Sequence, residues 1–186
     1  MPLWHAVHMK TLYPLTLLTA LLSACGTGLI PPVPYALPDI NATLPVPSTA
    51  SPMVVYSTVD QFTTLPVIAK AISSIELKGD LVYLGNGNLS TLSNVGIYIR
   101  GTVDGPNCYN QQGYLICADN TGQESGNKLQ DVAITKGNLQ SVTLAGDVLN
   151  TAVKNRTGYI GFRINTGSTL AGDQINFTKV NASIRF

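Results

Sequence analysis

The sequence predicts an all-β protein: an antiparallel β-sandwich, of immunoglobulin-like or jelly-roll type, with one short helix. From residue 53 onward, short runs alternate apolar and polar side chains with a period of two, which is typical of strands with one wet face. Turn-forming segments such as GNGN (85–88), DGPN (104–107) and NTGS (165–168) separate these runs. Charged residues make up only 11% of the chain, as in secreted β-proteins. We expect the sandwich to span residues 53–186 and to hold about seven to nine strands.

Three of these runs show the alternation most clearly. Each carries its apolar side chains at every second position and polar ones between them, so that one face of the strand is expected to be buried. The expected core positions are Ile75, Leu77, Leu81 and Tyr83 in the first run, Val95, Ile97 and Ile99 in the second, and Ile160, Phe162 and Ile164 in the third.

The last run, QINFTKVNASIRF (174–186), changes its alternation part-way along. Ile175 and Phe177 occupy odd positions, whereas the apolar residues from Val180 onward occupy even ones. A slip of one residue turns every side chain to the other face of a strand, so a straight strand cannot bury both sets. The pattern therefore predicts a β-bulge or bend near Thr178–Lys179, with Phe186 closing the core.

One segment departs from the strand pattern. GDVLNTAVKN (146–155) places Val148, Leu149, Ala152 and Val153 at helical spacing, with Asp147 at its start and Lys154 at its end. Those two charges complement the dipole of a helix. We expect one or two helical turns here, in a connection between strands.

The first 24 residues have the pattern of a signal peptide. Lys10 precedes an apolar stretch at 11–22, which is too short to span a bilayer unaided. Met9 begins a more regular signal than Met1 does. At the end of the stretch, the sequence Leu22-Ser23-Ala24-Cys25 resembles the lipobox of bacterial lipoproteins.

That resemblance implies a location and an anchor. In bacterial lipoproteins the signal is cut before the cysteine, whose thiol receives a diacylglycerol, and the new amino terminus is acylated, as with palmitate. Cys25 would be the lipidation site and would hold the protein at the membrane of the cell envelope. Gly26 follows where an Asp would commonly retain a lipoprotein in the inner membrane, so the resemblance favours the outer membrane where the organism has one.

Residues 25–52 form the expected tether between this anchor and the sandwich. Seven of the 11 prolines lie between residues 26 and 52, and proline disfavours both helices and central strands. We expect an extended, semi-rigid spacer. The alternative is that part of it packs along the edge of the domain.

Composition argues against several functions. Both histidines, His5 and His8, lie in the signal, so the mature chain has none for a catalytic triad or a zinc site. Its acidic residues are spread thinly and include only two glutamates, Glu76 and Glu124. We therefore expect no enzymatic activity and no cofactor. A formal net charge of +1 gives no electrostatic reason to expect nucleic-acid binding.

Cys108 and Cys117 bracket a sequence that suits a hairpin, with Gly113 near its middle. We expect a structural disulfide, because an exported location favours oxidation. The alternative is a redox-active pair. The sequence lacks Cys-x-x-Cys spacing, and no histidine or cluster of basic residues lies nearby to lower the pKa of a thiol.

Two further groups are candidates for binding. The polar loop after Cys117 offers oxygen ligands of the kind that calcium prefers, although a solvated loop is the alternative. Its candidate ligands are Asp119, Asn120, Glu124, Asn127 and Asp131. Tyr98 and Tyr159 point away from the expected core and could form a platform for a sugar or another small ligand; the alternative is that they are partly buried strand residues.

These observations together favour a non-catalytic role. We expect a lipid-anchored envelope protein whose sandwich binds another envelope protein, as an accessory or structural subunit. The hairpin Cys108–Cys117 and the loop after it are the expected contact surface, because rigidly mounted loops commonly carry function. The alternative is a module that binds a glycan or another small ligand.

Overall fold

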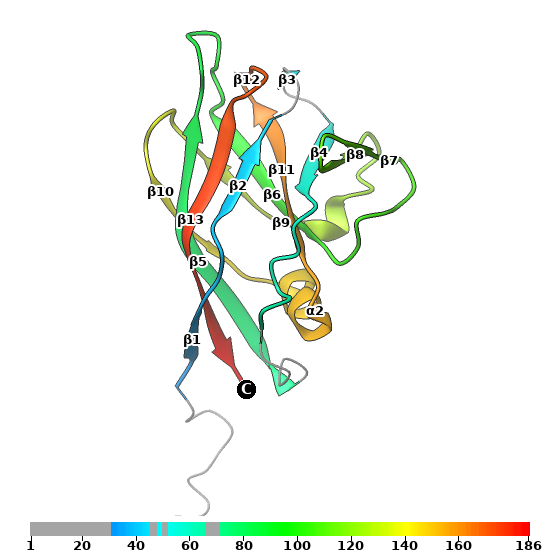
Figure 1. The fold of residues 1–186 in the computed structure, drawn as a ribbon, viewed down its shortest axis with the longest axis vertical. Coiled ribbons are helices and arrows are strands. Elements are labelled where there is room, and N and C mark those ends of the chain that lie inside the picture. Colours follow the sequence, from blue (N-terminus) through cyan, green and yellow to red (C-terminus); the bar gives the residue numbers. More distant parts are fainter. Residues whose placement is uncertain (1–30, 45–47, 50–51, 66–70) are drawn as a thin grey trace, which may run out of the picture. The chain divides into compact units, whose positions relative to one another are not determined.

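The computed structural model of the chain describes residues 31–44, 48–49, 52–65 and 71–186 (Figure 1). The signal segment, Met9 and Cys25 lie outside the described residues. Most of the described chain belongs to one compact unit, Pro32–Phe186. Within the described ranges, no helix has the length and apolar character needed to cross a membrane.

Antiparallel strands dominate this unit, which confirms the all-β prediction. One sheet contains β1 (Val33–Ala36), β2 (Ile40–Thr43), β13 (Gln174–Arg185), β5 (Ser74–Leu84) and β10 (Gln140–Leu144). The second sheet contains β7 (Cys108–Gln111), β8 (Tyr114–Ala118), β4 (Met53–Ser57), β11 (Tyr159–Thr166), β6 (Asn94–Arg100) and β9 (Lys128–Ala133). The short strands β3 (Ser48–Thr49) and β12 (Ser168–Thr169) form a separate pair.

The order of the strands is that of a jelly roll. In the first sheet, β2, β13, β5 and β10 lie side by side, and in the second β4, β11, β6 and β9 do. Numbered one to eight in chain order, these strands read 1-8-3-6 in one sheet and 2-7-4-5 in the other. Two Greek keys folded together give this order. Of the two topologies that the sequence allowed, the chain adopts the jelly roll.

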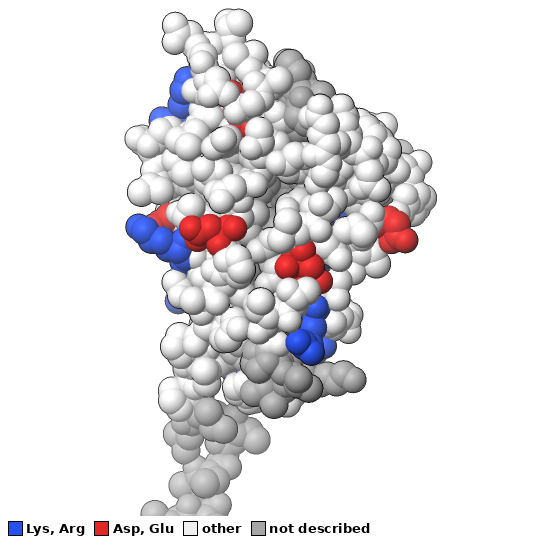
Figure 2. Space-filling model, in the orientation of Figure 1, with Lys and Arg blue, Asp and Glu red and all other residues white. Residues whose placement is uncertain are grey.

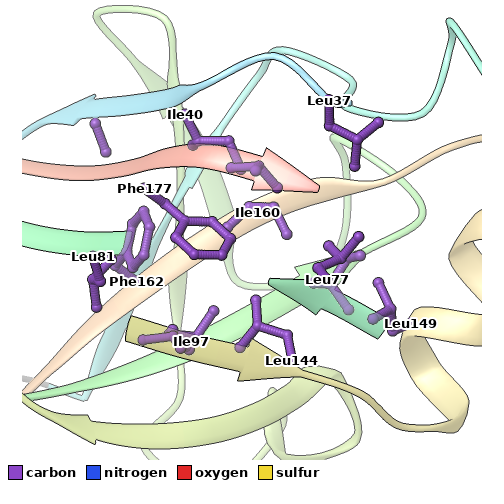
Figure 3. Packing of buried hydrophobic residues seen from close by; sticks show 14 of the residues in the cluster. Leu37, Ile40, Leu77, Leu81, Ile97, Leu144, Leu149, Ile160, Phe162 and Phe177 are labelled. Carbon is purple, nitrogen blue, oxygen red and sulfur yellow. The ribbon is translucent and has the colours of Figure 1, made fainter. Parts of the chain in front are cut away.

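Apolar side chains from both sheets meet in the space between them (Figure 3). All ten core positions expected from the three alternating runs are buried. Figure 3 shows Leu77, Leu81 and Phe177 from the first sheet with Ile97, Ile160 and Phe162 from the second. The period-two pattern therefore identified the inner faces of β5, β6 and β11 correctly.

The predicted irregularity in β13 is a β-bulge. Its pairing with β5 shifts between Thr178 and Asn181, and Lys179 takes a positive φ of 53°. The extra residue lets Phe177 and Val180 both point into the core. The expectation for Phe186 was wrong: its side chain is 36% exposed, because it follows the last residue of β13, Arg185.

The predicted helix is also present, as α2 (Asp147–Asn155). Its buried face is formed by Leu149, Ala152 and Val153, which join the main core. Asp147 lies in the first turn and Lys154 in the last, as the dipole favours. The helix ends at Arg156, whose left-handed conformation forms the C-cap.

The boundary of the domain differs from the prediction. Strands β1 and β2 lie within the segment expected to be a tether, and both pair with β13. Leu37, Ile40, Ala42 and Leu44 are buried in the core. Prolines did not prevent this, because β1 is an edge strand and its Pro34 is exposed there. The sandwich therefore begins near residue 33, and the alternative of packing along the domain edge holds for residues 33–44.

Candidate interaction surface at the disulfide hairpin

The most unusual part of the fold is a long connection between β6 and β9, residues 101–127, here called the insertion. β6 and β9 are direct neighbours in the second sheet, yet the chain makes a hairpin and a turn of 3-10 helix before returning. The hairpin, β7 and β8, extends the sheet beyond β4. The 3-10 turn, η2 (Ser125–Asn127), follows the hairpin and lies against the outer face of the sheet, where Asn127 and Tyr56 of β4 both bond Glu124.

A disulfide joins the two strands of the hairpin. Cys108 and Cys117 lie directly opposite each other in the β7–β8 pair, and their sulfur atoms are bonded, as the sequence predicted. Cys117 is fully buried, whereas Cys108 is only partly buried.

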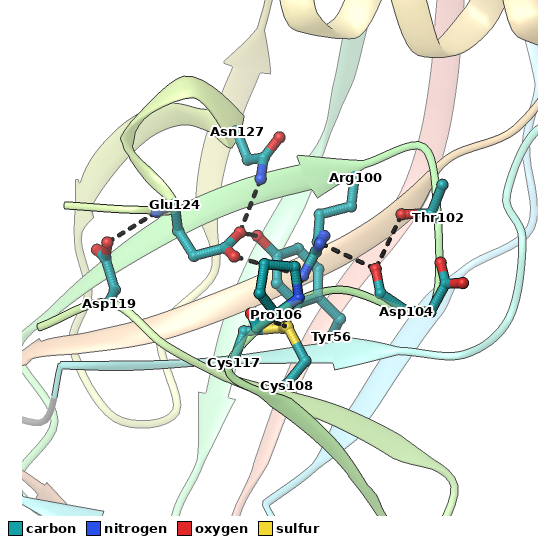
Figure 4. Close-up of a disulfide and its surroundings, with 10 residues drawn as sticks. All are labelled: Tyr56, Arg100, Thr102, Asp104, Pro106, Cys108, Cys117, Asp119, Glu124 and Asn127. Carbon is teal, nitrogen blue, oxygen red and sulfur yellow. Dashed lines mark hydrogen bonds and ion pairs between the residues drawn. A yellow bond between two sulfur atoms is a disulfide. The ribbon is translucent and has the colours of Figure 1, made fainter. Parts of the chain in front are cut away.

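Arg100, from the end of β6, is the centre of this region (Figure 4). Its Nη1 atom lies 2.8 Å from each of the two sulfur atoms and 3.3 Å from Oε1 of Glu124. Its Nη2 atom donates a hydrogen bond of 3.1 Å to the carbonyl of Asp104. One guanidinium group thus connects the hairpin, the loop after it and the segment before it. The sequence showed no histidine or cluster of basic residues beside the cysteines; the pairing of β6 in the sheet brings a single arginine, Arg100, there from outside the hairpin.

Glu124 is the buried partner of this arginine. Its carboxylate accepts hydrogen bonds from the Tyr56 hydroxyl at 2.6 Å and from the Asn127 amide at 2.7 Å. The ring of Tyr56 lies beneath the Arg100 guanidinium, 5.6 Å from Cζ to the ring centre. Burial and the neighbouring Glu124 carboxylate raise the pKa of Tyr56 far above its ordinary value, so the hydroxyl stays protonated and donates.

Arg100, Tyr56 and Glu124 form one unit of an arginine, a tyrosine and a carboxylate, and a second unit of these three residue types lies beside it. Arg163 of β11 pairs with Asp119 at 2.5 Å, and its guanidinium lies 5.5 Å above the ring of Tyr98. Asp119 also accepts a hydrogen bond of 2.8 Å from the backbone N–H of Glu124. Both carboxylates come from the loop after β8 and both arginines from the sheet. The two Arg–Tyr–carboxylate units therefore fix residues 119–127 to the outer face of the second sheet.

Two glycines make room for the tyrosine rings. Gly161 of β11 lies under the ring of Tyr56, and a Cβ atom there would overlap that ring. Gly96 of β6 lies against Tyr98, whose ring would be 2.8 Å from an added Cβ. Flat rings can lie on the sheet because these positions carry no side chain.

The five candidate calcium ligands do not come together around a common point. Asp119 faces Arg163 and Glu124 faces Arg100, while Asn127 donates its amide hydrogen to Glu124. Asp131 lies on β9 and pairs with Lys128 at 2.7 Å, and Asn120 is exposed. Although burial alone would raise it, the pKa of Asp131 is held low by hydrogen bonds from Lys128 and Asn165. Side chains of the protein itself thus occupy the oxygens of the three carboxylates, Asp119, Glu124 and Asp131.

The expected platform of Tyr98 and Tyr159 is also not formed. Both side chains lie on the outer face of the sheet, as the alternation predicted, but Tyr98 is only 1% exposed because Arg163 and the insertion cover it. Burial raises the pKa of Tyr98. Tyr159 is partly buried opposite Arg100. The alternative of partly buried strand residues is correct for Tyr159, and Tyr98 is buried completely.

One group among the described residues has the spacing of metal ligands: Cys108, Cys117 and Glu124, whose ligand atoms lie within 4.8 Å of one another. Its two sulfur atoms are bonded to each other, and Arg100 lies against all three side chains. In this oxidised form the cation of the site is the guanidinium of Arg100.

The surface that the insertion presents is polar and nearly uncharged. Asp119 and Glu124 are buried, so Asp104 is the one charged residue exposed within 101–127, a fully described segment. The exposed residues are mainly glycines and residues with amide or hydroxyl side chains, together with Tyr109 of β7, which is 52% exposed. Tyrosine, serine, glycine and asparagine on a rigid mount are also typical of antibody loops that bind proteins.

The chain matches no protein-family model, and a search of curated protein sequences found no significant match.

A shallow groove lies on the outer face of the other sheet, over the bulge of β13. It has a volume of about 280 Å³ and holds the ion pair of Lys179 and Asp80, whose atoms are 3.1 Å apart. Hydrogen bonds from Lys179 and Ser141 lower the pKa of Asp80. The groove is lined by Lys78, Gly79, Asp80, Ser141, Val142, Thr143, Lys179 and Asn181. Figure 2 shows that charged side chains are few on the face it displays, and that basic and acidic ones often adjoin.

Proposed function

We propose that this chain is a lipid-anchored, non-catalytic protein of the bacterial cell envelope, whose jelly-roll domain binds another envelope protein through the insertion. It would act as an accessory or structural subunit. The observation that carries the proposal is the pair of Arg–Tyr–carboxylate units, which mount a neutral, tyrosine-bearing surface rigidly on the sheet.

The rigid mounting of the insertion favours the binding of a partner. The two buried ion pairs fix the loop before a partner arrives, so that less conformational entropy is lost on binding. Because the insertion exposes amides and hydroxyls rather than charges, a partner covers it without removing water from unpaired ions. Tyr109 supplies a large amphipathic contact beside the outer edge of β7, which pairs with no further strand in the described chain.

The location rests on the lipobox resemblance of Leu22 to Cys25. Replacing Cys25 with serine removes the thiol that would receive the lipid. We expect wild-type protein to fractionate with membranes and to incorporate a labelled fatty acid, and C25S to do neither. If wild type and C25S associated equally with membranes, and the wild type took up no label, a lipid anchor at Cys25 would be contradicted.

The separation of the two glutamates supports the non-catalytic role. Glu76 lies on the outer face of β5 in one sheet, and Glu124 lies in the insertion, against the other sheet. These two residues cannot act together as the carboxyl pair of a glycosidase.

The binding proposal can be tested by site-specific crosslinking in cells that produce the full chain. A photo-reactive amino acid placed at Gln123 or at Tyr109 would lie on the proposed contact surface. The same residue at Thr151, exposed on α2, is the matched control. We expect one defined envelope protein to crosslink from both insertion positions and not from Thr151. The same crosslinks from Thr151, or none from the insertion, would overturn the proposal.

The groove on the first sheet favours a second candidate, a module that binds a glycan or another small polar ligand. It offers hydroxyl, amide, ammonium and carboxylate groups within one depression, which suits the recognition of sugar hydroxyls. Titration of the protein with oligosaccharides, in parallel with the Asn181→Ala variant, tests it. Saturable binding that N181A weakens would support this role, and unaltered binding would place the ligand elsewhere.

A further inference from the structure

Arg100 holds an unusual position next to the disulfide. A guanidinium nitrogen 2.8 Å from both sulfur atoms gains little from neutral sulfur, which accepts hydrogen bonds weakly. The same nitrogen would interact strongly with a thiolate, because the pair would then be oppositely charged. Only 12% of the arginine side chain is exposed, so water screens that attraction weakly.

The two sulfur atoms differ in their access to solvent. Cys117 lies on β8 and is fully buried in a small cluster with Tyr56 and Tyr98. Cys108 lies on β7, at the outer edge of the sheet, and is partly exposed. An incoming nucleophile therefore reaches Cys108 first, and the sulfur that leaves is that of Cys117.

We propose that Cys108–Cys117 is a thiol–disulfide exchange site for a dithiol, in which Cys108 is attacked and Arg100 stabilises the thiolate of Cys117 as the leaving group. This goes beyond the binding role and does not depend on it. Arg100 is here a positioning and charge-stabilising residue, supplied by β6 rather than by the hairpin.

The exchange proceeds in two balanced steps. A thiolate of the dithiol attacks Sγ of Cys108 and forms a mixed disulfide, while the electron pair of the broken bond goes to Sγ of Cys117. The second thiol of the dithiol, after losing its proton to water, then attacks its partner sulfur in the mixed disulfide. This step releases Cys108, which takes up a proton. Two electrons pass to the protein, and the dithiol becomes a disulfide.

Reduction would also change the contacts of the insertion. The Cys117 thiolate and the Glu124 carboxylate would then share one guanidinium, where the oxidised protein has a single ion pair. Two buried anions that compete for one cation hold the loop less firmly than one does. We expect faster amide hydrogen exchange over residues 119–127 in the reduced protein.

The test measures reduction of the purified full chain by dithiothreitol, in buffers with different ratios of reduced to oxidised reagent. The fraction reduced is read by alkylation and mass spectrometry. We compare the wild type with R100Q, R100K and R185Q. R185Q removes an exposed guanidinium at the end of β13, on the other sheet, and is the matched control.

We expect R100Q to lower both the rate of reduction and the equilibrium constant about tenfold, a change of about 30 mV in potential, with R100K and R185Q within about threefold of the wild type. In the reduced wild type, the ultraviolet absorbance of the Cys117 thiolate should titrate below the ordinary pKa of about 8.5. Equal reduction of R100Q and the wild type would overturn the proposal. So would a wild-type disulfide that dithiothreitol reduces only in denaturant. If R100Q does not fold, the thiolate titration of the wild type decides alone.

Discussion

The Tyr56 hydroxyl donates a 2.6 Å hydrogen bond to Glu124 and so joins strand β4 to a loop 68 residues further along the chain. The Glu124 side chain is only 6% exposed. A buried carboxylate is stable when a cation and hydrogen-bond donors replace the water that it has lost. Arg100 supplies the cation, and Tyr56 and Asn127 supply the donors. This arrangement makes Glu124 the residue on which the mounting of the insertion depends.

Glu124→Gln should therefore destabilise the protein markedly. The amide keeps the shape of the side chain but leaves Arg100 buried without an anion, which costs roughly 3–5 kcal/mol in comparable buried pairs. Urea unfolding followed by circular dichroism would measure the loss. A loss below about 1 kcal/mol would mean that the pair behaves as an exposed one.

Tyr56→Phe tests the hydrogen bond alone. The ring still packs under Arg100, so the expected loss is that of one hydrogen bond to a charged group, roughly 1.5–3 kcal/mol. Tyr109→Phe, on the exposed surface of β7, is the matched control and should stay within about 0.5 kcal/mol of the wild type. Equal losses in both variants would show that the Tyr56 hydroxyl has no special role.

The early strands β1 and β2 lead to a prediction about the domain boundary. A chain beginning at residue 53 lacks Leu37, Ile40, Ala42 and Leu44 and exposes one edge of β13. Burial of an aliphatic side chain contributes about 1.5–3 kcal/mol, so the loss approaches the whole stability of a domain. We expect a chain starting at residue 32 to unfold cooperatively, and one starting at residue 53 to aggregate or lack a thermal transition. Equal melting temperatures would contradict the boundary drawn here.

The sequence predicted correctly those features of the fold that depend on residues close together along the chain. Alternation located the inner faces of β5, β6 and β11, and its break located the bulge at Lys179. The prediction of a tether was wrong beyond residue 32, because the number of prolines in a segment does not show whether that segment forms a strand at an exposed edge of the sheet. Alternation in Ile40–Thr43 is too short to stand out against the prolines around it.

The site was less predictable because its residues meet only after the sheet has formed. Arg100 reaches the cysteines through pairing of distant strands, and the alternation marked Tyr98 as outward without showing that the insertion covers that face. The one local signal was the small residues Gly96 and Gly161 at outward positions, which mark where a ring or backbone approaches closely.

Asp173 should give the protein an acid-dependent stability. It is fully buried and accepts hydrogen bonds from the Tyr83 hydroxyl at 2.5 Å and from the N–H groups of Asn86 and Leu170. Although burial alone would raise it, these bonds hold the pKa of Asp173 below its ordinary value. Burial and the Asp173 carboxylate in turn raise the pKa of Tyr83 to about 12, so its hydroxyl stays a donor.

Because the pKa of Asp173 is lower in the folded state than in the unfolded state, this carboxylate stabilises the folded protein. Its contribution to the free energy of unfolding is complete above the unfolded pKa, about 4, and is lost as the pH falls through the lower folded value. Asp173→Asn should cost roughly 1–3 kcal/mol at neutral pH and remove this part of the acid dependence. The difference in unfolding free energy between wild type and D173N, measured from neutral pH to pH 3, reports it. A difference that does not shrink as the pH falls would contradict the lowered pKa of Asp173. D104N, at an exposed carboxylate, is the control.

Gly161→Ala tests whether the tyrosine ring really lies on the sheet. Its Cβ atom would overlap the ring of Tyr56, which Arg100 and Glu124 hold from above, so the ring cannot move aside without breaking the buried pair. Overpacking of this kind costs typically about 1–3 kcal/mol. Gly101→Ala, where the described neighbours leave the added atom in open space, should change stability by less than about 0.5 kcal/mol.

Because the strain falls on Tyr56, the double variant G161A/Y56A should be more stable than the sum of the two single losses predicts. Strict additivity in that cycle would show that the two residues do not touch.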